Sequence, residues 1–191
     1  CGGGASSTVA VHPVGLSYAG LWAPTGTQLT FQVGIYQNIP GGTYGSDADF
    51  TEVNPAAKAN YHLSREEVNV VKALARDFQV RLALYGQYTN DALVPGEQFG
   101  LGGMNSVRGF LERAISNDKG YSGQAEFYSP DFGPPLKLGR STLRALAFYD
   151  FGAAFANNPQ PGQIASTHIS SAGVGLRFGY GKYVFLRADA A

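Results

Sequence analysis

The sequence predicts an all-β chain, namely an antiparallel up-and-down sheet that forms part of a transmembrane β-barrel. Apolar and polar residues alternate along most of the 191 residues, which is the pattern of strands with one apolar and one polar face. Long connections alternate with short turns. Charged residues make up 15% of the chain, against roughly 25% in soluble domains, whereas glycine and aromatic residues are abundant.

The first half of the chain predicts four strands, at residues 8–22, 27–37, 59–75 and 77–89. The second and fourth alternate most regularly, for example with Leu82 on the apolar face and Arg81 on the polar face. The third changes phase near Glu66, which predicts a bulge in that strand. A short amphipathic helix after residue 65 is the alternative for the same segment.

The connection at 90–119 is long and has a glycine-rich centre, "GLGGMNSVRGF" at 100–110. Such a loop is flexible unless another part of the protein holds it. Arg108 is the charged residue in this centre. Long connections with little structure of their own are usually functional or disordered. We therefore expect Arg108 to anchor the loop to an acidic partner elsewhere in the chain.

The second half of the chain predicts four further strands, at residues 121–128, 142–155, 170–180 and 183–190. Between the first two, the proline-rich segment 130–140 predicts a stiff turn. Two carboxylates fall in phase on the polar faces of these two strands, Glu126 on the first and Asp150 on the second. Both are therefore candidates for the partner of Arg108.

The connections differ in length in a regular way. Short turns are expected at 23–26, 75–77 and 179–182, whereas long polar connections are expected at 40–58, 90–119 and 156–167. Tight turns at one end and long loops at the other are the layout of outer-membrane barrels. A Greek-key sandwich has no such parity, so the spacing favours strands that run up and down.

The two faces of the predicted strands differ in chemistry. The polar face carries large charged side chains, which are Arg81, Glu126, Arg144, Asp150, Arg177 and Arg187. Aromatic residues gather near strand ends, where interfacial girdles lie, and these are Trp22, Tyr36, Tyr88, Phe155 and Tyr180. No stretch reaches the roughly 20 apolar residues of a membrane-spanning helix. A membrane barrel with its apolar face outward is favoured, and a soluble barrel with that face inward is the alternative.

Arginine suits an anchor inside a barrel, because its planar guanidinium holds a carboxylate through two hydrogen bonds and stays charged. A loop that folds into the lumen brings Arg108 within reach of Asp150 and Glu126. Such a pair positions the loop more than it stabilises the protein, since burying both charges offsets much of their attraction. The alternative is that Arg108 is a solvated loop residue and Asp150 a separate lumen charge.

Two motifs resemble those of a known superfamily. The stretch "LGGMNSVRGF" (101–110) resembles the V-R-G-F/Y signature of the outer-membrane protein-assembly and two-partner-secretion superfamily, and "FYDFG" (148–152) resembles its F-x-D-x-G strand motif. The stretch 86–103 is similar, more narrowly, to two-partner-secretion transporters, the haemolysin and filamentous-haemagglutinin secretion/activation proteins. The motif residues are Gly102, Gly103, Val107, Arg108, Gly109 and Phe110 in the loop and Phe148, Asp150 and Gly152 in the strand.

The resemblance covers about 26–190 and implies both a fold and a function. It implies a sixteen-strand barrel in the outer membrane of a Gram-negative bacterium, preceded by two periplasmic POTRA domains. It implies that the loop folds into the lumen, where Arg108 pairs with Asp150 and, as in the related assembly factors, with Glu126. The implied activity is secretion, without ATP, of a large haemolysin- or adhesin-type exoprotein that passes unfolded through the barrel.

About eight strands are visible, and no POTRA-like segment precedes them. We therefore expect residues 8–191 to be the C-terminal part of such a barrel, with the lumen loop at 90–119. Residues 1–7, which begin at Cys1 and are rich in glycine and serine, are expected to form a flexible segment. The expected partners are the exoprotein in transit, outer-membrane lipid, and the missing POTRA domains and barrel strands.

No enzyme site, cofactor or metal is expected. His12, His62 and His168 lie in separate strands without the spacing of metal ligands, and no P-loop or G-x-S-x-G motif is present. Basic and acidic residues balance at 14 each, so no polybasic surface for nucleic acid is predicted. Two alternative functions share the fold, namely an outer-membrane protein-assembly factor and a general porin or structural barrel.

Overall fold

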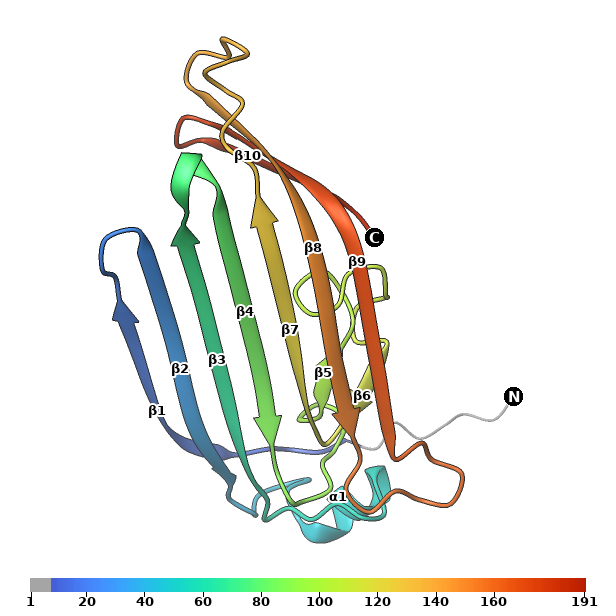
Figure 1. Ribbon diagram of the computed structural model, residues 1–191. Coiled ribbons are helices and arrows are strands. Elements are labelled where there is room, and N and C mark those ends of the chain that lie inside the picture. Colours follow the sequence, from blue (N-terminus) through green and yellow to red (C-terminus); the bar gives the residue numbers. More distant parts are fainter. Residues whose placement is uncertain (1–7) are drawn as a thin grey trace.

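The computed structural model describes residues 8–191, so the flexible segment predicted at 1–7 lies outside the described residues. Eight antiparallel strands form one sheet in the order β1-β2-β3-β4-β7-β8-β9-β10 (Figure 1). The chain segment that connects β4 to β7 forms a separate, two-stranded sheet, β5-β6. The large sheet contains β1 (Pro13–Trp22), β2 (Thr27–Asn38), β3 (His62–Ala73), β4 (Gln79–Tyr88), β7 (Lys119–Tyr128), β8 (Ser141–Phe155), β9 (Ser166–Tyr180) and β10 (Val184–Ala190). This architecture confirms the predicted all-β, up-and-down fold class.

The register of the strands places the polar residues of neighbouring strands beside one another. β4 pairs with β7 so that Arg81 lies opposite Glu126, and β7 pairs with β8 so that Gln124 lies opposite Asp150. Residues that are directly opposite in two strands point to the same face of the sheet. The alternation in the sequence therefore corresponds to two chemically different faces.

β3 is a regular strand, so the predicted bulge near Glu66 and the alternative helix are both wrong. Its residues pair one for one with β2 along one edge and with β4 along the other. Arg65 and Glu67 share the polar face with Arg81, whereas Glu66 points to the opposite face. Hydrogen bonding along both edges fixes the register of this strand, although its side-chain pattern changes phase.

The connection between β2 and β3 contains a short helix, α1 (Asp47–Val53), where the sequence predicts only a polar loop. Ser46 caps its N-terminus and forms a reciprocal capping box with Asp49. Phe50 is buried and packs in a small apolar cluster with Tyr61 and Leu93. The spacing of Ser46 and Asp49 is the signal for this helix in the sequence.

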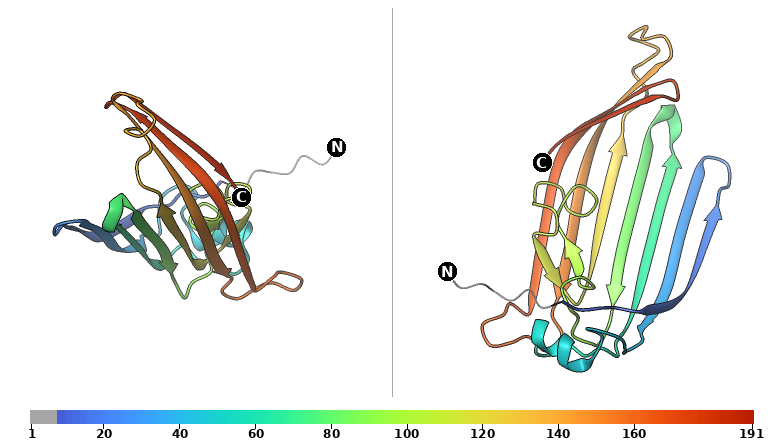
Figure 2. Two further views of the ribbon diagram at one scale, coloured as in Figure 1. Left: turned by 45° about the horizontal axis from the view of Figure 1, so that its top comes forward. Right: turned by 180° about the vertical axis from the view of Figure 1, so that it is seen from behind.

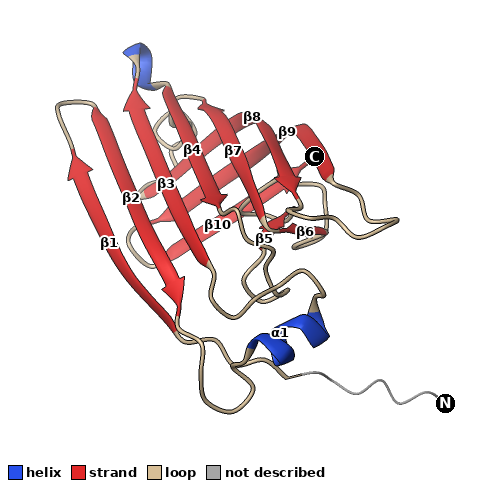
Figure 3. Ribbon diagram, turned by 90° about the horizontal axis from the view of Figure 1, so that it is seen from below, coloured by secondary structure: helices blue, strands red, loops and turns tan. Residues whose placement is uncertain are grey.

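The connections at 39–61, 89–118 and 156–165 lie at one end of the sheet together with α1 (Figure 1). The short turns lie at the other end, together with the proline-rich connection at 129–140. The sheet itself is curved rather than flat (Figure 3). Within residues 8–191, no helix combines the length and the apolar character needed to cross a bilayer.

The face of the sheet opposite the polar residues is apolar and exposed. Side chains that are each more than a third exposed on this face include Leu16, Tyr18, Ile35, Leu82, Leu84, Phe127, Tyr149, Val174 and Leu176. An apolar surface of this extent normally meets a membrane or another protein rather than water. The buried apolar clusters of the described chain lie instead among the loops, one around Phe50 and one around Phe99.

Candidate functional site

The connection between β4 and β7 folds back over the large sheet. It contains a short hairpin, β5 (Phe99–Leu101) and β6 (Ile115–Asn117), with residues 102–114 between its strands. Figure 2 shows this hairpin lying against the large sheet, and β5 contacts both β7 and β8. Val107 is buried in one apolar cluster with the hairpin and Ala154 of β8. Apolar packing therefore holds the base of the loop on the sheet.

Glycines allow the loop and the sheet to approach closely. Gly102, Gly103 and Gly109 have φ angles of 106°, 100° and 86°, in the left-handed region that residues with a Cβ avoid. On the sheet, a Cβ at Gly152 would collide with Leu101 of the loop. The glycine of the strand motif therefore leaves the space that the docked loop occupies.

Arg108 lies at the centre of the site and forms ion pairs with two carboxylates. Its Nε and Nη2 donate to Oδ2 and Oδ1 of Asp150 at 2.6 and 2.7 Å, and its backbone N–H donates to Oδ2 at 3.0 Å. Its Nη1 donates to Oε1 of Glu126 at 2.7 Å. Arg108 and Glu126 are each 4% exposed and Asp150 is fully buried. The structure thus brings together the three residues that the sequence analysis singled out as an anchor.

The guanidinium of Arg108 also lies over the ring of Phe148, with its Cζ atom 3.6 Å from the ring centroid. A cation at this position is attracted by the negative face of the ring. Phe148 and Asp150 are two residues apart on β8 and therefore project from the same face. One strand thus supplies both the ring and the carboxylate that contact Arg108.

The electrostatics of the site favour a charged arginine. Burial disfavours the charge of Arg108, but its hydrogen bonds to Asp150 and Glu126 outweigh this effect and raise its pKa above the ordinary arginine value. The two carboxylates carry one more charge than Arg108 neutralises. Further cations must therefore be close to the site.

These cations come from the sheet itself and were not predicted as site residues. Nη1 of Arg81 donates to Oε2 of Glu126 at 3.0 Å, and the hydroxyl of Tyr128 donates to the same oxygen at 2.8 Å. Nη2 of Arg177 lies 3.6 Å from Oε1 of Glu126. The sequence places both arginines on the polar face, but it does not show that they converge on Glu126.

Asp189 of β10 is a third carboxylate near Arg108 that the sequence analysis missed. Its Oδ2 lies 3.7 Å from Nη1 of Arg108. It also accepts from Nη1 of Arg177 at 2.7 Å and from Nε of Arg187 at 2.6 Å. The sequence places Asp189 two residues after Arg187 on one face of the last strand, but it does not show that this face meets Arg108.

Two residues of the loop motif lie away from the ion pairs. Phe110 is 40% exposed and does not reach them. Gly109 lies over β9, where a Cβ on it would be 4.0 Å from Cβ of Ser171. Gly109 therefore allows close approach of the loop to a second strand, and the structure assigns no contact role to Phe110.

Asp118 holds the other end of the connection. It lies between β6 and β7 and is buried. Its carboxylate accepts from the backbone N–H groups of Leu93 at 2.7 Å and Asn157 at 2.6 Å. One side chain thus joins the start of the loop to the connection between β8 and β9.

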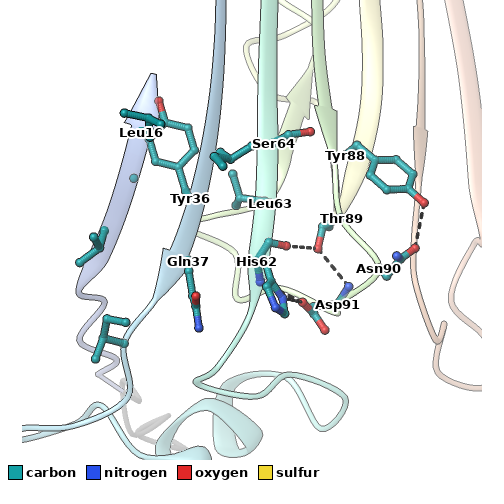
Figure 4. Close-up of a pocket in the computed structure, with 14 residues that line it drawn as sticks. Leu16, Tyr36, Gln37, His62, Leu63, Ser64, Tyr88, Thr89, Asn90 and Asp91 are labelled. Atoms are coloured by element: carbon teal, nitrogen blue, oxygen red, sulfur yellow. Dashed lines mark hydrogen bonds and ion pairs between the residues drawn. The ribbon is translucent and has the colours of Figure 1, made fainter. Parts of the chain in front are cut away.

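A groove of about 790 Å³ lies near the end with the long loops (Figure 4). Leu16 and Tyr88, which belong to the apolar face, are part of its lining, and His62 and Asp91 line its polar end. Nδ1 of His62 lies 3.2 Å from Oδ2 of Asp91. These residues lie on strands and a loop away from Glu126 and the other carboxylates around Arg108, so the groove is separate from the loop site.

The histidines are dispersed. His12 precedes β1, His62 begins β3 and His168 lies in β9. Over the described range 8–191, no group of three or more His, Cys, Asp or Glu side chains is placed to hold a metal ion.

A family model matches most of the chain. The family is described as "Haemolysin secretion/activation protein ShlB/FhaC/HecB", and its model matches residues 5–178. The matched range includes the loop with Arg108 and the strand with Asp150.

Curated relatives also match over most of this chain. The protein named "Heme/hemopexin transporter protein HuxB" from Haemophilus influenzae strain 86-028NP is 30% identical over 141 residues, which cover 71% of this chain and 23% of that protein. The protein of the same name from Haemophilus influenzae strain KW20/Rd is 31% identical over 134 residues, which cover 67% of this chain and 22% of that protein. The chain therefore spans less than a quarter of the length of these relatives.

Proposed function

The chain belongs to the haemolysin secretion/activation protein family ShlB/FhaC/HecB, and from this premise we propose that it forms the C-terminal barrel part of an outer-membrane pore that secretes an exoprotein. Residues 8–191 supply the strands, and the connection at 90–119 supplies a loop that lies in the lumen. The apolar face of the sheet meets lipid of the outer membrane. The polar face lines the path of the exoprotein.

The observation that carries the proposal is the buried set formed by Arg108, Asp150 and Glu126. A guanidinium held by two carboxylates at 2.6 to 2.7 Å fixes the loop against the polar face of the large sheet, which is the wall of the proposed lumen. A passive pore for small solutes needs no such attachment. The protein-assembly factors share it, but the family match and the transporter relatives favour secretion over assembly.

The transport step that we propose contains no covalent chemistry. The wall offers charges of both signs and hydrogen-bonding groups, so an extended chain can exchange its contacts with water for contacts with the wall without binding tightly. The docked loop occupies part of the lumen and shapes the remaining path. Folding of the exoprotein outside the cell makes its return unfavourable.

The cargo is a separate question from the pore. The family description points to haemolysin-type cargo, and the Haemophilus relatives are named as heme/hemopexin transporters. An exoprotein that binds haem or hemopexin is therefore to be tested beside haemolysins and adhesins. The gene next to that of the transporter is the first place to look for the cargo.

Charge reversal tests the role of the anchor. In the full-length transporter, Asp150→Arg should impair secretion of the exoprotein encoded by the neighbouring gene, because two buried cations then face each other. Leaving a buried charge unpaired costs roughly 3–5 kcal/mol. The measurement is the amount of epitope-tagged exoprotein in the culture medium, normalised to the amount of transporter in the outer membrane.

The second arm of this experiment restores opposite charges. Arg108→Asp combined with Asp150→Arg should recover part of the secretion that the single variant loses, since the two charges attract again. Wild-type secretion by the single Asp150→Arg variant, at normal transporter levels, would rule out the anchoring role.

A further inference from the structure

The two oxygens of Glu126 have different kinds of partners. Oε2 is held by residues of the sheet alone, since Arg81 and Tyr128 donate to it at 3.0 and 2.8 Å. Oε1 accepts from Arg108 of the loop at 2.7 Å. Nη2 of Arg177 lies beside that contact, 3.6 Å from the same oxygen. Arg177 is therefore next to the position that Arg108 occupies.

The sheet is close to electrically balanced without the loop. The charged residues of the sheet that form the ion pairs of the site are three arginines and three carboxylates, namely Arg81, Arg177, Arg187, Glu126, Asp150 and Asp189. Arg144 lies opposite Arg177, but it is paired with Asp77 of the turn between β3 and β4. Arg108 brings one positive charge to this set. Undocking of the loop therefore leaves these residues of the sheet with no net charge, and the remaining electrostatic cost falls on Asp150, whose carboxylate loses its donor.

We propose that Arg177 makes docking of the loop reversible, by taking the place of Arg108 at Oε1 of Glu126 when the loop leaves the lumen. This inference rests on the proposed secretion function. Arg177 is already fixed by Asp189, which accepts from its Nη1 at 2.7 Å. Its Nη2 donates to Oδ2 of Asp189 at 3.3 Å and lies 3.6 Å from Oε1 of Glu126. A small movement that keeps the bond from Nη1 therefore carries Nη2 to Glu126 and completes a bridge between the two carboxylates. Arg177 is thus a positioning residue for the loop.

Asp150 differs from Glu126, because no residue of the described sheet donates a hydrogen bond to its carboxylate. Within residues 8–191, every side-chain hydrogen bond that Asp150 accepts comes from Arg108. The docked loop is therefore held mainly by Asp150, whereas at Glu126 the guanidinium of Arg177 can replace that of Arg108. It follows that removing Arg177 strengthens docking, because Arg108 becomes the sole cation near Oε1 in the described chain.

Ion current through the full-length transporter tests the proposal. The purified protein is placed in planar bilayers in KCl solution, and the fraction of time in the high-conductance state reports undocking of the loop. Arg177→Gln should lower this fraction about fivefold, the change in population that a modest electrostatic contact produces. Arg177→Lys keeps the charge and should restore most of the current.

Arg187→Gln is the matched control. It removes the same charge from the same carboxylate, Asp189, but Arg187 has no contact with Glu126 in the described structure. Nη2 of Arg187 also donates to the carbonyl oxygen of Met104 in the loop at 3.4 Å, so this variant removes one contact of the docked loop and should not lower the current. A smaller loss of current in Arg187→Gln than in Arg177→Gln supports the proposal. Equal losses in both variants, or no loss in Arg177→Gln, would overturn it, provided that heat-modifiable gel mobility shows folded barrels.

Failure of this inference is distinguishable from failure of the proposed function. If Arg177→Gln and Arg187→Gln give equal currents while Asp150→Arg still impairs secretion, Arg108 anchors the loop but Arg177 does not replace it at Glu126. If Asp150→Arg secretes normally, the anchoring role itself is lost, whatever the current of the Arg177 variants.

Discussion

The ring of Phe148 lies beneath the guanidinium of Arg108, at 3.6 Å from Cζ to the ring centroid, in a site where both side chains are about 95% buried. Desolvated contacts between a cation and an aromatic ring contribute about 2 kcal/mol, more than exposed ones. We therefore expect Phe148→Leu to weaken docking of the loop by about 1–2 kcal/mol. The high-conductance fraction of the full-length transporter in planar bilayers should rise accordingly.

Two further variants test whether the effect comes from the contact between the aromatic ring and Arg108. Phe148→Tyr keeps the ring, although its hydroxyl must fit against Gly173, and the current should lie closer to wild type than in Phe148→Leu. Tyr149→Leu removes a ring from the next position of the same strand, but on the apolar face, and should have no effect on the loop. A wild-type current in Phe148→Leu would show that the ring does not contribute to docking.

Part of the site follows from local sequence and part does not. Arg108, Glu126 and Asp150 are predictable, because a lone arginine in a glycine-rich loop needs a partner and both acids keep the inward phase of their strands. Asp189 and Arg177 meet the site only because β10 pairs with β9 and the loop reaches across them. No local pattern encodes that approach, so these residues appear only when the sheet is assembled.

At the scale of single elements, two lysine variants in β4 test which face of the sheet meets lipid. Leu82 and Ala83 are neighbours at one depth, and Leu82 belongs to the exposed apolar face whereas Ala83 pairs with Gln124 on the polar face. A lysine on the lipid side costs roughly 2–4 kcal/mol near the middle of the bilayer. Leu82→Lys should therefore reduce the folded transporter in the outer membrane much more than Ala83→Lys.

The readout for this pair is the heat-modifiable, folded fraction in isolated outer membranes. Both variants add the same side chain to the same strand, so intrinsic strand preference cancels in the comparison. A larger loss for Ala83→Lys than for Leu82→Lys would mean that the faces are assigned the wrong way round.

The turn between β3 and β4 gives a prediction on pH. Nη2 of Arg144 donates to both carboxylate oxygens of Asp77 at 2.8 and 2.9 Å, and the backbone N–H of Asp131 donates to Oδ2 at 2.9 Å. These hydrogen bonds, chiefly that of Arg144, lower the pKa of Asp77 below its ordinary 3.8. The stabilisation is therefore complete above about pH 4 and is lost as the pH falls through the lowered value.

Asp77→Asn makes this dependence measurable. The unfolding temperature of the full-length transporter in detergent should be lower in the variant than in wild type at pH 7. The difference should stay constant down to about pH 4 and shrink below it, as the carboxylate of the wild type becomes protonated. A difference that persists unchanged at pH 2 would exclude Asp77 as its source.

The strands of the large sheet are predictable because each has two faces of different chemistry, and the period of two is visible in the sequence. β3 is the instructive exception. Its outward face carries Ser64 and Glu66 where its neighbours carry apolar residues, so the pattern breaks although the strand does not. For the helix α1, the capping residues Ser46 and Asp49 are a local signal, but the packing of Phe50 with residues from distant segments is not visible in the sequence.

At the scale of the whole molecule, β1 and β10 each pair with one neighbour in the described sheet. Lipid does not tolerate unpaired strand edges. The sheet is therefore expected to join further strands at both edges, in agreement with relatives of which the chain spans less than a quarter. We expect the loop to lie inside such a closed barrel, where its movement would open or close the lumen.

A covalent link tests whether that movement is needed for transport. A Cβ on Gly109 would lie 4.0 Å from Cβ of Ser171, within the roughly 3.5–4.5 Å of a disulfide. The full-length transporter with Gly109→Cys and Ser171→Cys should lose secretion on oxidation and regain it with dithiothreitol, because the link holds the loop in the lumen. Gly109→Cys alone carries the same backbone strain at φ 86° and should not respond to oxidation. Unchanged secretion by the oxidised double variant, with the link shown by gel shift, would mean that the exoprotein passes beside a docked loop.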